Sequence, residues 1–178
     1  MLFLVINILP FLGFTNLFLY YFDYVFELVF VAYYVTKQLL NIFKPLFYII
    51  TGGYTLFLVV DLFTWEGLNV FGSYAAAVQK IIIIFLCMYY IVSLAKTDDL
   101  LLFQKLPGFW ITTGFLLSAA ISIFSAVTYK YYIEYNVFGE NVWFFESIGT
   151  ILKFTFIITG FLCYKRSSRL PYQSPTSL

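Results

Sequence analysis

The stretch IIIIFLCMYYIVSLA, from Ile81 to Ala95, decides the fold class of this protein. It is a continuous apolar run in which polar and apolar residues do not alternate. The lipid bilayer offers no water to backbone amides, so a segment that crosses it must be a helix or a strand of a closed barrel. Barrel strands alternate over about 10 residues, with polar positions facing the lumen. The run therefore predicts a helix, and with it an all-α bundle of transmembrane helices.

The composition extends this interpretation to the whole chain. Of its 178 residues, 62% are hydrophobic and 11% are charged, whereas soluble domains carry about 25% charged residues. A water-soluble core of this size leaves too much surface outside to bury so many apolar side chains. The net charge of +1 does not fit a nucleic-acid surface, which needs clustered Lys and Arg. We expect an integral membrane protein that contacts the lipid bilayer and no nucleic acid.

Five segments are long and apolar enough to be spans of about 20 residues. They lie at 16–36, 43–63, 72–95, 107–129 and 142–164. Residues 1–165 are expected to form a single transmembrane domain, and residues 166–178 a tail. The first 15 residues are apolar but short, and Pro10 and Gly13 interrupt them. We expect a short apolar stub, re-entrant or interfacial, on the outer side of the membrane, while a partial span and a signal segment stay open as alternatives.

Basic residues in the connecting segments predict the orientation. Alternate connections and the tail hold seven Lys and Arg residues, and the remaining two connections hold only Lys130. The seven are Lys37, Lys44, Lys96, Lys105, Lys165, Arg166 and Arg169. Because Lys and Arg are enriched on the cytoplasmic side, we expect a multi-pass protein of the cell inner membrane with a cytoplasmic C-terminus.

Five ionisable residues are placed well inside the expected spans, namely Asp23, Glu27, Lys80, Glu146 and Lys153, whereas Lys44 and Asp61, at the ends of the second span, are assigned to the connections. A charge at the bilayer centre costs about 2.5–3.5 kcal/mol on insertion scales, so such residues usually face the protein interior and pair. Counted from the outer end, Glu27 and Lys153 lie at one depth, and Asp23 and Lys80 at another. We expect these two pairs to form. They either fix the packing of the helices or mark a path for ions or protons.

Small residues predict close contacts between helices. The stretches GSYAAA and GFLLSAAISIFSA begin at Gly72 and Gly114 and carry Gly, Ser and Ala at spacings of three and four. Such faces let membrane helices approach closely. The positions expected to pack are Gly72, Ala76, Gly114, Ser118 and Ser122. The third and fourth spans are therefore expected to pack on each other or on a partner.

No catalytic constellation is visible in the sequence. The chain has no histidine, which removes the commonest metal ligand and the commonest general base. It also lacks the nucleophile, zinc and phosphate-loop motifs. Cys87 and Cys163 lie in separate apolar segments without metal-binding spacing. We therefore expect no enzymatic activity, no cofactor and no metal.

Three stretches carry a resemblance to a known family. They are NLFLYYFDYVFELVFVAYY from Asn16, LPGFWITTGFLLSAA from Leu106 and WFFESIGTILKFTFIITGFLCYK from Trp143. The chain resembles a family of uncharacterised multi-pass, seven-span-like inner-membrane proteins of Bacteroidota. Asn16, Tyr20 and Glu27 match the first motif, and Pro107, Phe109 and Trp110 match the second. The resemblance implies a member without the first two spans, in an envelope or signalling context, and it implies no activity.

Two functions remain after these exclusions. The first is a non-enzymatic accessory, assembly or signalling subunit that packs against other membrane protein subunits or against itself. The second is a channel or transporter subunit that uses the intramembrane Asp, Glu and Lys residues for ion or proton passage. Intramembrane charges are compatible with both functions.

Overall fold

The computed structural model describes residues 17–38, 44–64, 72–96, 106–134 and 140–167. These residues form five helices: α2 (Leu17–Gln38), α3 (Lys44–Thr64), α4 (Ser73–Ala95), α5 (Pro107–Glu134) and α6 (Glu140–Ser167). The all-α prediction is confirmed, and each helix covers one of the five expected segments. The expected N-terminal stub and most of the tail lie outside the described residues.

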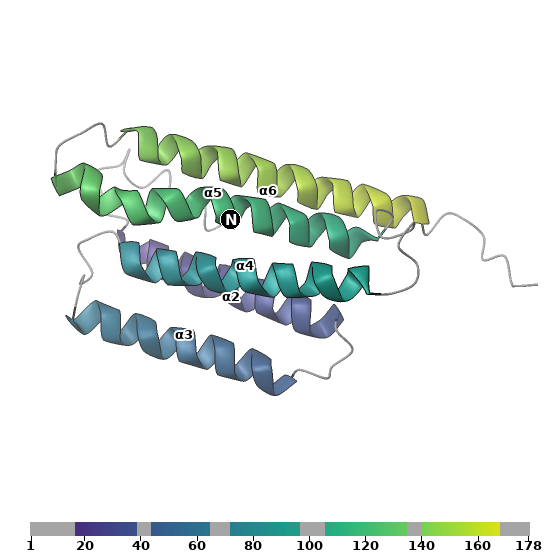
Figure 1. The fold of residues 1–178 in the computed structure, drawn as a ribbon, viewed down its shortest axis with the longest axis horizontal. Coiled ribbons are helices and arrows are strands. Elements are labelled where there is room, and N and C mark those ends of the chain that lie inside the picture. The colour runs from purple at the N-terminus through teal and green to yellow at the C-terminus, as the bar shows by residue number, and fades with distance from the viewer. Residues whose placement is uncertain (1–16, 39–43, 65–71, 97–105, 135–139, 168–178) are drawn as a thin grey trace, which may run out of the picture.

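The helices run up and down beside one another in a bundle (Figure 1). α5 packs between α4 and α6, and α2 packs on α3 and α4. α3 lies at the edge of the bundle, where it contacts α2 more than α4. α4 and α5 are the more deeply buried of the helices that follow α2: 44% of the most apolar stretch of each is buried, against 17% for α3 and 11% for α6. α4 and α5 therefore form the centre of the bundle.

The buried face of α2 follows the helical repeat. Tyr21, Tyr24, Leu28, Val31 and Val35 are all buried, at spacings of three and four residues. This spacing places side chains on one face of a helix. The other face exposes a row of aromatic rings: Phe22, Phe26, Phe30 and Tyr33 are each more than half exposed. α2 thus presents one apolar face to the bundle and a second one outward.

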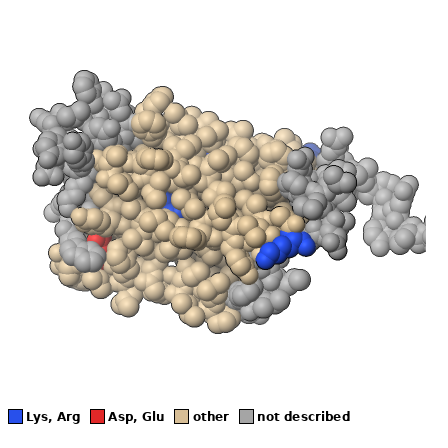
Figure 2. Space-filling model, viewed as in Figure 1, with Lys and Arg blue, Asp and Glu red and all other residues tan. Residues whose placement is uncertain are grey.

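The outer surface of the bundle is apolar as well. Figure 2 shows one face that is tan almost throughout, with charged residues mainly near its ends and one small blue area near its middle. All five helices expose large apolar side chains. α2 contributes its aromatic row, and the other four helices contribute residues such as Tyr48, Phe63, Phe85, Phe124 and Phe161. Soluble monomers rarely expose contiguous apolar surface of this extent. The surface is that of a membrane protein.

Within the described residues, four helices are long and apolar enough to cross a membrane, by length and composition. These candidate spans are Pro45–Thr64, Ser73–Ala95, Pro107–Thr128 and Phe144–Lys165. α2 was also expected to span, but it is not among them. Its 22 residues include Asp23, Glu27 and five tyrosines, and these polar groups lower its hydropathy. The crossing by α2 therefore stays a prediction.

Threonines within the helices satisfy their hydroxyl groups locally. The Oγ1 atoms of Thr51, Thr55 and Thr155 each donate a hydrogen bond of 2.7–2.8 Å to the carbonyl oxygen four residues earlier. Thr36 and Thr113 do the same. A polar group without a partner in hydrocarbon is costly. These bonds let α3 and α6 carry hydroxyl groups on surfaces that lack protein neighbours.

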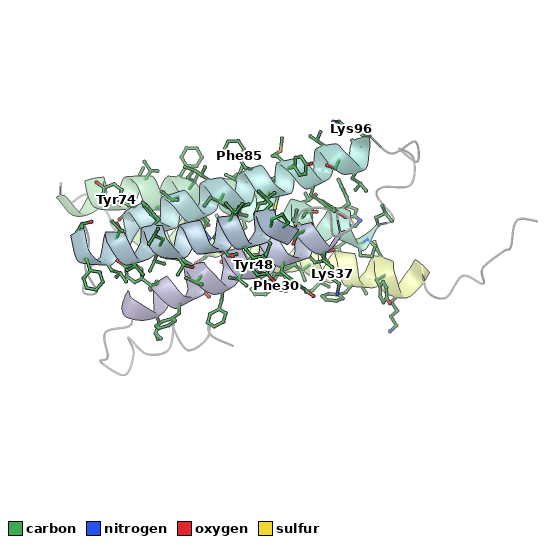
Figure 3. All side chains as sticks on the ribbon, turned by 90° about the horizontal axis from the view of Figure 1, so that it is seen from below. Phe30, Lys37, Tyr48, Tyr74, Phe85 and Lys96 are labelled. Carbon is green, nitrogen blue, oxygen red and sulfur yellow. The ribbon has the colours of Figure 1, made fainter. Side chains whose placement is uncertain are left out.

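Basic side chains mark one end of the bundle. Lys37, Lys96 and Lys165 lie at or near the C-terminal ends of α2, α4 and α6, and these three ends lie together in Figure 1. Figure 3 shows Lys37 and Lys96 at the same end, with Tyr74 at the other. The up-and-down topology therefore gathers the charges that the sequence places after alternate segments.

Candidate functional site

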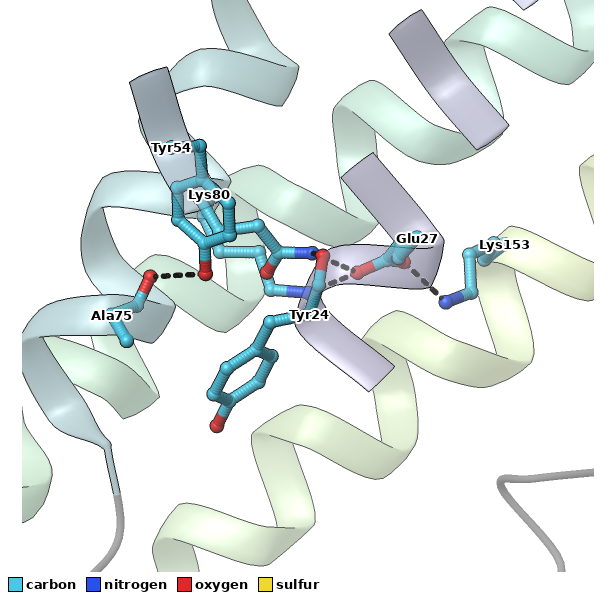
Figure 4. Close-up of polar contacts among 7 residues, drawn as sticks. Tyr24, Glu27, Tyr54, Ala75, Lys80 and Lys153 are labelled. Carbon is cyan, nitrogen blue, oxygen red and sulfur yellow. Dashed lines mark hydrogen bonds and ion pairs between the residues drawn. The ribbon is translucent and has the colours of Figure 1, made fainter. Parts of the chain in front are cut away.

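Glu27 of α2 is the centre of a buried group of charges (Figure 4). Its Oε2 atom lies 2.7 Å from Nζ of Lys80 on α4, and its Oε1 atom lies 2.7 Å from Nζ of Lys153 on α6. Distances of about 2.7–2.9 Å are those of charge-assisted hydrogen bonds. A single carboxylate thus joins three helices, and we call Glu27, Lys80, Lys153 and the neighbouring Gln79 the Glu27 cluster.

Gln79 completes the coordination of the carboxylate. Its Nε2 atom donates to Oε2 of Glu27 and to the backbone oxygen of Tyr24, both at 3.0 Å. The side chain is fully buried, and its Oε1 atom has no hydrogen-bond partner among the described residues. Because both amide hydrogens point to acceptors on α2, the amide orientation is fixed by its partners. Gln79 holds α4 to the backbone of α2 as well as to the acid.

The two lysines reach Glu27 from different surroundings. The Lys80 side chain is 7% exposed and the Lys153 side chain 19%. The Lys153 ammonium also lies 5.7 Å from the ring centroid of Phe115 and 5.9 Å from that of Phe154, within the range of cation–π attraction. Lys153 thus sits nearer the surface, where aromatic rings cover it in part, and Lys80 lies inside the bundle.

The structure brings together only part of the predicted charge pairs. The pairing of Glu27 with Lys153, expected from their equal depth, is observed. Asp23 lies within electrostatic reach of Lys80, as expected, but the two form no direct ion pair, because the Lys80 ammonium binds Glu27. Asp23 and Glu27 are one helical turn apart, about 6 Å along the axis. A lysine side chain spans that distance, so a depth counted in residues does not decide which acid it reaches.

Asp23 and Glu146 are not part of the Glu27 cluster. Both side chains are half-buried, and neither makes a hydrogen bond or an ion pair within 4 Å with another described residue. Asp23 nevertheless lies within electrostatic reach of Glu27, Lys80, Lys153 and Glu146. All five predicted ionisable residues therefore share one region of the bundle, but only three of them are in direct contact.

The small residues of α5 lie against α6. A Cβ atom added at Gly114 would lie 2.7 Å from Cβ of Phe156 and 3.1 Å from the backbone oxygen of Lys153. A Cβ at Gly149 of α6 would lie 3.3 Å from the backbone oxygen of Ser118 and 3.2 Å from Oγ of Ser122. Small residues on both helices thus let the backbones approach. α5 also packs on α4, as expected. The contacts of Gly114, Ser118 and Ser122 described here, however, are made with α6.

The other small positions lie at the start of α4. Ala76 is buried, with 3% of its surface exposed. A Cβ at Gly72 would lie 2.8 Å from the ring of Tyr21 on α2, and Tyr54 of α3 donates its hydroxyl to the backbone oxygen of Ala75 at 3.1 Å. The start of α4 therefore packs closely against α2 and α3 rather than against α5 alone.

Sequence reasoning missed two buried polar residues, Gln79 and Asp61. Gln79 precedes Lys80 in an apolar span, and a polar amide in such a span was a usable signal. Asp61 was assigned to the connection after the second span, but it lies in α3 and is fully buried. It follows Tyr54 and Leu58, both buried, at spacings of seven and three residues. That spacing places it on the inner face of α3.

The chemistry open to the Glu27 cluster is charge pairing and hydrogen bonding. Among the described residues, no group of three or more His, Cys, Asp and Glu side chains is arranged to hold a metal ion. Cys87 is buried beside the bundle core and Cys163 lies on α6. The carboxylate of Glu27 already accepts three hydrogen bonds, which leaves about one of its four lone-pair sites for another donor. The arrangement stabilises the association of three helices.

Comparisons with known proteins add no relative of the chain. No family model matches it, and no curated protein or solved structure matches it either.

Proposed function

We propose that this protein is a non-enzymatic, multi-pass protein of the cell inner membrane that acts as an accessory, assembly or signalling subunit. In this proposal α2 crosses the bilayer together with the four candidate spans of α3, α4, α5 and α6. The observation that carries it is the Glu27 cluster, where two lysines and an amide converge on one buried carboxylate. Buried ionic groups specify how helices associate in some proteins, and we infer this role for the Glu27 cluster.

The outer surfaces of α3 and α6 support a role in packing against other membrane proteins. Both helices bury little of their apolar windows within the bundle. On α3, Gly52 and Gly53 lie on the outside, and a Cβ atom at either would meet nothing within 4 Å. Glycines in membrane helices are enriched where helix backbones approach each other. A bundle with two such outer helices has surface to offer to a partner.

The membrane, the orientation and the family belong to the same proposal. A cytoplasmic C-terminus is supported by Lys37, Lys96 and Lys165, which gather at one end of the bundle, because basic residues are enriched on the cytoplasmic side. The inner membrane and an origin among the Bacteroidota multi-pass proteins rest on the sequence motifs alone.

The second candidate function is a channel or transporter subunit. It is favoured by Asp23 and Glu146, two half-buried acids near the cluster that make no ion pair with a described residue, since such residues often mark ion paths. It is disfavoured by Glu27 itself, whose two oxygens are both bound to lysines. An acid held in this way is a poor relay for a moving ion or proton.

Two measurements on the purified protein separate these functions. Solubilisation in a mild detergent should retrieve the subunit with a membrane protein at a fixed stoichiometry. Liposomes that contain the subunit alone should pass ions and protons no faster than protein-free liposomes. Retrieval of the subunit alone, together with a flux that depends on it, would replace the accessory role by the transport role.

A further inference from the structure

The region around Glu27 carries an excess of negative charge. It contains three acids, Asp23, Glu27 and Glu146, and two lysines, Lys80 and Lys153, all within electrostatic reach of Asp23. Both lysines bind Glu27, so neither is committed to the other two acids. Three acids against two lysines leave one negative charge that these five residues do not balance.

Asp23 is the acid that an outside group can approach. It is half-buried on α2, directly beside the outward row of aromatic rings, and its neighbours Phe22 and Phe26 are 55% and 64% exposed. Phe30 continues this row and contacts Phe115 of α5, with ring centroids 5.8 Å apart. The surface formed by Asp23, Phe22, Phe26 and Phe30, which we call the α2 flank, is therefore apolar with one acid in it.

Hydrocarbon makes an acid without a basic partner unfavourable. Ionisable residues within membrane segments almost always face the protein interior or water and pair with one another or with backbone carbonyls. Asp23 makes no ion pair with a described residue, and α2 exposes its aromatic row beside it. A helix that packed on the α2 flank would cover these rings and bring a side chain to the carboxylate.

We propose that the α2 flank binds a transmembrane helix of a partner protein that carries one Lys or Arg at the depth of Asp23. This inference rests on the proposed accessory function and names the chemistry of the partner. One positive charge balances the excess, and an ammonium or guanidinium forms a charge-assisted hydrogen bond with the carboxylate. A second copy of this chain fits less well, because its own Lys80 and Lys153 already bind Glu27.

A designed peptide tests the α2 flank without the natural partner. The full chain, with a fluorescent protein fused after Leu178 as the donor, is reconstituted in phosphatidylcholine–phosphatidylglycerol vesicles. The probe is an acceptor-labelled peptide of about 23 Leu and Ala residues, long enough to span, with one Lys about seven residues from one end. Its parent with Leu at that position and a peptide with Lys at the opposite depth are the controls. Energy transfer above the level of random mixing reports association.

The Lys peptide is expected to bind the chain about 5- to 30-fold more tightly than its Leu parent, the range of a polar contact between membrane helices. Asp23→Asn should remove this gain, and Glu146→Gln should reduce it less. The Asp23→Lys variant should bind a peptide with Glu at the same position more tightly than the Lys peptide. This result would show that a variant at Asp23 still folds and that the charge at this position determines which peptide binds. The peptide with Lys at the wrong depth should behave like the parent.

The inference is overturned if the Lys peptide binds no better than its parent, or if Asp23→Asn keeps the full gain. Its failure is separable from failure of the proposed function. If a membrane protein co-purifies while the Lys peptide does not bind, only the assignment of the α2 flank is lost. If the peptide binds as expected but no membrane protein co-purifies, the proposed accessory function is refuted, whereas the assignment of the α2 flank as a helix-binding surface is supported.

Discussion

Lys153 of α6 binds Glu27 of α2 across 126 residues of sequence, with its ammonium 2.7 Å from the carboxylate. The backbones of α2 and α6 are not close neighbours in the bundle, so the two side chains span the space between them. Lys80 and Gln79 bind the same carboxylate from α4. α2, which is not among the candidate spans found in the described residues, is thus held by polar contacts to two helices that follow it in the chain.

Removal of the central carboxylate should destabilise the bundle strongly. Glu27→Gln leaves Lys80 and Lys153 without their common acid, and breaking one side of a buried pair costs about 3–5 kcal/mol in soluble proteins. Because both lysines lose their partner, adding Lys153→Met alone to Glu27→Gln should restore little stability. The triple variant Glu27→Leu, Lys80→Met and Lys153→Met should restore most of it. Thermal unfolding in detergent measures both effects, and equal rescue by Lys153→Met alone would contradict the shared role of Lys80.

The same variants separate structure from transport. If the Glu27 cluster only fixes helix packing, the rescued triple variant should co-purify with the partner as the original chain does. If the cluster is part of a path, that variant should be stable and inactive in the flux assay.

The two lysines should act non-additively. Lys80→Met or Lys153→Met alone leaves Glu27 one ammonium and the Gln79 amide, whereas the double variant leaves a carboxylate with a neutral donor only. The loss in unfolding free energy for the double variant should exceed the sum of the single losses by about 0.5–3 kcal/mol, the range of coupling between residues in one network. Additive losses would show that Lys80 and Lys153 contribute independently of each other and would contradict their coupling through Glu27.

The double lysine variant also bears on the insertion of α2. This helix carries two acids and is not among the candidate spans found in the described residues. Without Lys80 and Lys153, the acids of α2 lose their nearest basic groups, so the protease resistance of α2 in membranes should fall. Glu146→Gln, which removes no observed ion pair, is the matched control.

Gly114 should be intolerant of any side chain. The Cβ atom of Gly114→Ala would lie 2.7 Å from Cβ of Phe156 and 3.1 Å from the backbone oxygen of Lys153, and neither is the mobile end of a side chain. Overpacking of this kind costs about 1–3 kcal/mol. Gly52→Ala is the control, because nothing lies within 4 Å of its added Cβ and alanine favours helix over glycine. A fall in the unfolding temperature is expected for Gly114→Ala alone, and equal behaviour of the two would refute a close α5–α6 crossing.

The orientation gives a prediction that does not depend on the Glu27 cluster. A reporter fused after Leu178 should read cytoplasmic, and one inserted at Asn136 should read external, because basic residues gather at the opposite end of the bundle from the α5–α6 connection. Two reporters are used at each position, one that is active only in the cytoplasm and one that is active only outside it, and their signals should be complementary. The reverse pattern would overturn the orientation while leaving the helix packing unchanged.

The sequence by itself determined the elements of this protein and their class. Continuous apolar runs such as Ile81–Ala95 have one stable form in hydrocarbon, because only a helix satisfies its backbone hydrogen bonds within the segment. The low polarity of the hydrocarbon also predicted that Glu27 and Lys153 pair, since a charge in lipid needs an opposite charge at its own depth. Gly114 could likewise be assigned to a close contact, because its missing side chain matters only where another helix approaches.

Only the tertiary structure decided which residues meet. Depth along a helix says nothing about rotation around it, and a lysine side chain reaches about one helical turn. Lys80 could therefore bind Glu27 or Asp23, and the packing of α4 on α2 directs it to Glu27. In the same way the small residues of α5 were expected against another helix, and the crossing of α5 with α6 sets Gly114 against Phe156. Spacing in a sequence places side chains on a face, but the neighbour of that face depends on how all the helices pack at once.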